Sequence, residues 1–135
     1  HQTRRLMKKS PVVPILLATL WISIHEFLRN QLLLKDAWVS HYADMGLTFP
    51  AAPVNGAIWG VWSLALASII YILSKKHSLT ETCILAWING FLLMWIVIGN
   101  LSVLPFSILP YAIPWSALEV YGAARIAFAW KHRKA

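Results

Sequence analysis

The sequence predicts an all-α membrane protein: four transmembrane helices in a bundle, with a short amphipathic outer helix between the first and second spans. Of its 135 residues, 59% are hydrophobic and only 13% are charged, whereas soluble domains carry roughly 25% charged residues. The apolar residues also gather in four stretches close to the roughly 20 residues that cross the hydrocarbon core of a bilayer. A single cysteine, Cys83, excludes a disulfide scaffold.

Each predicted span is bounded by charged residues, by prolines or by both. The spans cover residues 11–28, 55–73, 82–103 and 111–130. Together they form one domain, residues 11–130, between an N-terminal tail (1–10) and a basic C-terminal tail (131–135). Because the chain begins with His1, we interpret residues 1–6 as the remnant of a cleaved tag and Met7 as the native start.

Positive charge gathers where the predicted spans end on one side of the membrane. Nine of the 12 Lys and Arg form three clusters: Arg4, Arg5, Lys8 and Lys9; Lys75 and Lys76; and Lys131, Arg133 and Lys134. The opposite side carries only Arg29 and Lys35 in a long loop. Since cytoplasmic loops are enriched in Lys and Arg, we expect both termini in the cytoplasm, in a bacterial inner membrane. A nucleic-acid partner is excluded, because it requires a basic face on a soluble fold.

The first outer loop, residues 29–54, has a helical pattern of its own. Apolar and aromatic residues recur there at helical spacing: Leu34, Trp38, His41, Tyr42 and Met45. Gly46 is a helix stop, and two prolines then break the chain before the second span. The pattern predicts a short helix that either covers the bundle as a lid or anchors it at the interface.

Polar residues inside the predicted spans are the candidate binding residues, because ionisable groups in hydrocarbon need a partner or a function. Glu119 lies about 12 Å below the outer end of the fourth span, at 1.5 Å per residue. Eleven residues separate Asn89 from Asn100, which places both on one face of the third span, where they are expected to donate to Glu119. His25 and Glu26 end the first span, at the mouth of an outward-facing cavity with Glu119 as its floor. The predicted ligand-binding set is Glu119, Asn89, Asn100, His25, Glu26 and Trp115, the last as an aromatic residue near the outer interface. The alternative that Glu119 and the asparagines only hold the helices together, without binding a ligand, is also retained.

Small residues mark one face of the second span. Gly56, Gly60, Ser63 and Ala67 follow one another at helical spacing, which allows another backbone to approach closely. The stripe predicts a packing seam, either within the bundle or between two copies of the chain.

No motif identifies a reaction or a family. The sequence contains no GxSxG, HExxH or P-loop pattern, and its histidines do not form a zinc motif. No catalytic residue or metal ligand is assigned, the cofactor is unknown, and an enzyme is disfavoured. We expect a protein that binds, and in one version transports, a small apolar or amphipathic molecule in the outward-facing cavity. The expected partners are the lipid bilayer, this ligand, and a second copy or another membrane protein. The alternative is a non-catalytic assembly subunit, and the third hypothesis is an intramembrane enzyme.

Overall fold

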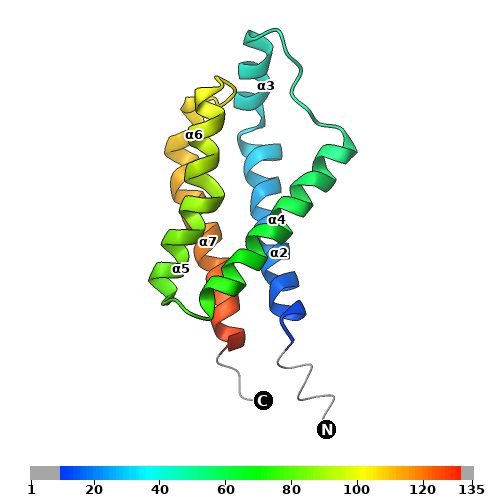
Figure 1. The fold of residues 1–135 in the computed structure, drawn as a ribbon. Coiled ribbons are helices and arrows are strands. Elements are labelled where there is room, and N and C mark those ends of the chain that lie inside the picture. Colours follow the sequence, from blue (N-terminus) through cyan, green and yellow to red (C-terminus); the bar gives the residue numbers. More distant parts are fainter. Residues whose placement is uncertain (1–9, 132–135) are drawn as a thin grey trace.

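The computed structural model describes residues 10–131, and all regular structure in that range is helical (Figure 1). Several helices contain or adjoin a π-helical or 3-10 segment, labelled η. In chain order the elements are α2 (Val12–Phe27), η1 (Leu28–Leu33), α3 (Lys35–Asp44), α4 (Pro53–Ser74), α5 (Leu79–Trp87), η2 (Ile88–Leu92), α6 (Leu93–Asn100), η3 (Phe106–Ile108) and α7 (Leu109–Lys131). The predicted tag remnant, the whole N-terminal basic cluster, and Arg133 and Lys134 of the C-terminal cluster lie outside the described residues.

Three helices in the described range are long and apolar enough to cross a membrane. They are Val12–Leu33, Pro53–Ser74 and Leu79–Asn100, each of 22 residues. The chain is therefore a helical membrane protein. The fourth long helix, α7, is not among them, because Glu119, Arg125 and its prolines reduce its hydropathy. A fourth span stays a prediction.

The first long helix differs from the predicted one at its end. We expected the span to stop at residue 28 and Arg29 to lie in the outer loop. Instead α2 runs without a break into η1, and the helix ends at Leu33. Arg29 is only 3% exposed. The helix can continue through this charge because acidic side chains inside the protein neutralise it.

The helices pack through small side chains. Helix α2 contacts both α4 and α7, and α5 contacts α7. Buried alanines lie at these contacts, among them Ala18, Ala67, Ala123 and Ala127. Large apolar side chains instead point outward, for example Leu20 at 58% and Val61 at 66% exposure. An apolar outer surface around a small-residue interior is the distribution expected of helices packed in lipid.

Trp21 of α2 packs against Gly122 of α7. A Cβ atom built on Gly122 would lie 2.3 Å from Cε2 of Trp21, so only glycine leaves room for the indole ring. The indole Nε1–H of Trp21 then donates to the backbone carbonyl of Glu119 at 2.8 Å. This contact fixes the first helix against the last one.

The two ends of the bundle differ. The start of α2, the α4–α5 turn and the end of α7 lie at one end, whereas α3 lies at the other (Figure 1). There Nε2–H of His41 in α3 donates to the carbonyl of Ser102 after α6, at 2.7 Å. A short helix, α3, thus follows the first long helix, and its amphipathic character and place at the membrane surface stay predictions.

Candidate functional site

An ion cluster is buried where α2, η1 and α7 meet. Its members are Glu26, Arg29 and Glu119, which are 5%, 3% and 0% exposed. Nη2 of Arg29 donates to Oε1 of Glu26 at 2.5 Å, and Nη1 donates to Oε1 of Glu119 at 3.0 Å. One guanidinium therefore joins two carboxyl groups that are far apart in the sequence. We call these three residues the buried ion cluster.

Asn30 and Trp38 extend the cluster toward α3. The amide nitrogen of Asn30 donates to Oε2 of Glu26 at 2.8 Å, and the indole N–H of Trp38 donates to Oδ1 of Asn30 at 3.3 Å. Both oxygens of Glu26 thus accept a hydrogen bond. In contrast, Oε2 of Glu119 is buried and has no hydrogen-bond partner within residues 10–131.

Both π-helical segments of the described chain lie at the cluster. Arg29 and Asn30 belong to η1, and the ring of Phe91 in η2 lies 5.4 Å from Cζ of Arg29. A π-helical turn accommodates one residue more than an α-helical turn, and such turns often occur at functional sites. Here the two turns bring a cation from one helix against an aromatic ring from another.

The cluster contains two acidic groups and one basic group. With both carboxyls ionised, its formal charge is −1. Uncompensated charge is costly in a low-dielectric interior. The group is neutral when it holds one proton or a second cation, so its chemistry suits exchange of a proton or a cation.

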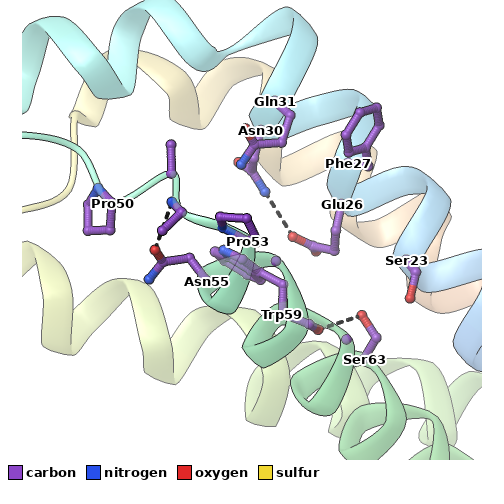
Figure 2. A pocket seen from close by; sticks show the side chains of 14 residues that line it. Ser23, Glu26, Phe27, Asn30, Gln31, Pro50, Pro53, Asn55, Trp59 and Ser63 are labelled. Atoms are coloured by element: carbon purple, nitrogen blue, oxygen red, sulfur yellow. Dashed lines mark hydrogen bonds between the residues drawn. The ribbon is translucent and has the colours of Figure 1, made fainter.

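A cavity of about 430 Å³ opens beside the cluster, between the first long helix and the beginning of α4 (Figure 2). We call it the polar cavity. Glu26 and Asn30 form one wall, and Gly56, Trp59 and Gly60 form the opposite wall. Figure 2 shows the carboxylate of Glu26 directed between the two helices. A Cβ atom on either glycine would meet nothing within 4 Å, so the absence of side chains there leaves the space open.

A second cavity of about 370 Å³ adjoins the first and is mainly apolar, with five aromatic residues among the twelve that line it. We call it the aromatic cavity. The two cavities share four lining residues, Asn30, Pro50, Asn55 and Trp59. Rings from α3, the following loop and α4 line half of the rest, namely Trp38, Tyr42, Phe49 and Trp62. Apolar side chains without rings line the other half, namely Ile58, Met94, Ile98 and Val103. Phe49 packs against Tyr42 with ring centroids 5.2 Å apart, so part of this wall is formed by the segment predicted to be a lid.

The structure brings together some of the predicted binding residues. Glu26 lines the polar cavity, and Glu119 is joined to it through Arg29. His25 and Trp115 form a separate pair, in which the indole N–H donates to Nδ1 of the imidazole at 2.8 Å. That pair is not among the residues that line either cavity.

The predicted contact of the two asparagines with Glu119 is wrong. Asn89 and Asn100 are both exposed, and the Asn89 amide donates to its own helix, to the carbonyl of Leu85 at 2.7 Å. The prediction assumed 3.6 residues per turn throughout the third span. Asn89 itself lies in the π-helical segment η2, which continues to Leu92, so this regular spacing does not hold.

The four residues of the predicted small-residue stripe lie in two different environments. Ser63 and Ala67 are buried, at 1% and 0% exposure. Gly56 and Gly60 instead face the polar cavity, with no neighbour at the position of a Cβ atom.

Arg29, Asn30 and Trp59 were not predicted as site residues. One signal in the sequence identifies the first of them. Glu26 and Arg29 are three positions apart, and the apolar stretch resumes after them up to Leu34, as in a helix that buries an ion pair.

Fold and site together define a helical membrane protein with a charged group beside a cavity. No protein-family model, no curated protein and no solved structure matches the chain. The function is therefore inferred from the site alone.

Proposed function

We propose that the protein binds a small apolar or amphipathic molecule between its first long helix and α4. The polar cavity carries this proposal. Its volume of about 430 Å³ falls within the roughly 300–1,000 Å³ of small-molecule sites. Its walls combine an apolar side with a carboxylate and an amide, the combination that orients an amphipathic ligand.

We also propose that α7 is a fourth span and that the protein is multi-pass, with both termini in the cytoplasm of a bacterial cell. Helix α7 has 23 residues and is about 34 Å long at 1.5 Å per residue, enough to cross the hydrocarbon core. Glu119 and Ser116 face inward, whereas Leu118 is 53% exposed. The α4–α5 turn, which contains Lys75 and Lys76, lies at the same end as the start of α2 and the end of α7. That arrangement agrees with the positive-inside rule.

In this orientation the polar cavity opens toward the outer side, and α3 lines the adjoining aromatic cavity through Trp38 and Tyr42. Arg29 connects the ligand site to Glu119, because it donates to both carboxyls. Binding of a ligand next to Glu26 would therefore change how the guanidinium of Arg29 is shared between the carboxyls of Glu26 and Glu119. If the protein transports its ligand, protonation of Glu119 is coupled to that transport.

Native mass spectrometry of the detergent-solubilised protein tests the binding function. Gly60→Leu is the informative variant, because the new side chain enters open space in the polar cavity. Val61→Leu is its matched control, because Val61 is 66% exposed on the outer face of the same helix. We expect a reproducible non-lipid mass on the wild-type protein and on Val61→Leu, and its loss from Gly60→Leu. Retention of that mass by Gly60→Leu would refute the assignment of the cavity.

The alternative is a non-catalytic assembly subunit, and one observation favours it. Gly56 is exposed and has no neighbour at its Cβ position, so another helix has room to approach there. The same spectra decide this point, because an oligomer that becomes monomeric in Gly60→Leu identifies the stripe as an interface. An unchanged subunit count would exclude it.

A further inference from the structure

We propose that the ligand is an organic monocation with a flat apolar body, its charged head against Glu26 and its body in the aromatic cavity. This inference rests on the proposed binding function and adds the chemical class of the ligand. It follows from the charges and rings that line the two cavities.

The charge of the lining residues favours a cationic head. Glu26 is the one acidic or basic side chain among the described residues that line either cavity. Its two oxygens each accept one hydrogen bond, and a carboxylate has about four lone-pair sites, so it can accept from a further donor. An anion would face this carboxylate with no positive side chain on the wall. The buried ion cluster has two carboxyl groups but only one guanidinium. A cationic ligand supplies a second positive charge, which brings the formal charge of the cluster to zero when both carboxyls are ionised.

Asn30 does not compete for this role. Its amide nitrogen already donates to Glu26, and its oxygen already accepts from Trp38. Asn30 therefore holds the carboxylate in place and separates the charged region from the aromatic one. The head group of the ligand is left with Glu26 as its principal polar partner.

The aromatic cavity suits the rest of the molecule. Its rings come from three parts of the chain, and Trp59 lines both cavities. Ring faces attract cations and stack on flat apolar groups. An apolar body in the aromatic cavity thus continues directly from a head beside Glu26, across the four residues that the cavities share.

A matched pair of probes tests the charge requirement. The cation is (2-naphthylmethyl)trimethylammonium, and the neutral isostere is 2-neopentylnaphthalene, in which carbon replaces the ammonium nitrogen. Equilibrium dialysis against the protein in lipid nanodiscs measures both. Binding to the cavity is the difference between the amount of probe bound by wild-type nanodiscs and by Gly60→Leu nanodiscs. This subtraction removes the probe that partitions into the lipid. We expect the cation to bind at least about tenfold more tightly than the isostere through its charge alone, because the quaternary head has no N–H to donate and attracts Glu26 as an ion pair.

Glu26→Gln then locates the source of the preference, because glutamine keeps the shape and removes the charge. We expect this variant to bind the two probes equally within about threefold, a difference below 1 kcal/mol. Equal binding of both probes to the wild-type protein, or a cation preference that survives Glu26→Gln, would overturn the cationic ligand and leave the binding function standing. If Gly60→Leu binds both probes as the wild type does, the binding function itself fails. The comparison on the wild type decides the question even if Glu26→Gln does not fold.

Discussion

Arg29→Met is the most direct test of the buried ion cluster. Methionine keeps an unbranched, mainly apolar stem but lacks the guanidinium, so both hydrogen bonds, to Glu26 and to Glu119, are removed. Each carboxyl is at most 5% exposed and would lose its cationic partner. Removing one partner of a buried ion pair costs about 3–5 kcal/mol, and two pairs share this guanidinium. We therefore expect the free energy of unfolding to fall by at least about 3 kcal/mol.

The assay is an unfolding titration with sodium dodecyl sulfate in mixed micelles, followed by circular dichroism. Arg125→Met is the matched control, because Arg125 is an exposed arginine on α7. An exposed substitution of this kind changes stability by about 0.5 kcal/mol or less. If Arg29→Met lowers the free energy of unfolding by no more than Arg125→Met does, the buried ion cluster is refuted.

The remaining predictions use the same titration. Gly122→Ala should lower the free energy of unfolding by about 1–3 kcal/mol, because its methyl group displaces the ring of Trp21. Ser102→Gly should raise it by about 0.5 kcal/mol, because Ser102 has a φ of 65°, a left-handed conformation that glycine adopts without a steric cost. Ser78→Ala should lower it by about 1 kcal/mol, because the hydroxyl of Ser78 caps α5 by accepting from the backbone N–H of Glu81 at 3.1 Å.

Each of these predictions has a contrary outcome. Gly60→Ala is the control for Gly122→Ala, since the added methyl group meets open space, and an equal loss in both would contradict the close approach of Trp21. A less stable Ser102→Gly would show that the serine side chain contributes more than its backbone conformation costs. An unchanged free energy of unfolding in Ser78→Ala would show that water replaces the hydrogen bond of the cap.

The helices themselves were predictable from apolar runs and their ends. Gly46 follows the end of α3 with a φ of 74°. Pro53 was expected to precede the second span but begins α4, because proline is tolerated in a first helical turn. The end of the first span was not predictable in the same way. A hydropathy pattern treats Arg29 as a boundary, because the partner that neutralises it is 90 residues away.

The site was predictable in part. Glu119 and Glu26 were identified because carboxyl groups are rare in apolar segments. The positions of Asn89 and Asn100 were not, because a π-helical turn leaves no clear mark in the sequence and changes which side chains share a face. An outward-facing cavity at Glu26 was expected, but its wall on α4 was not, since Gly56 and Gly60 predict a close contact as readily as an open space.

The separation of the charged partners has a consequence for biosynthesis of the protein. Arg29 and Glu26 are synthesised together, three positions apart on the same helix, so the first helix can enter the membrane as a locally neutral unit. On the four-span arrangement, Glu119 enters only with the last helix, and a carboxyl at mid-membrane costs roughly 2.5–3.5 kcal/mol on insertion scales. Its docking onto Arg29 offsets that cost. On that arrangement, the first helix already in place favours membrane integration of the last one.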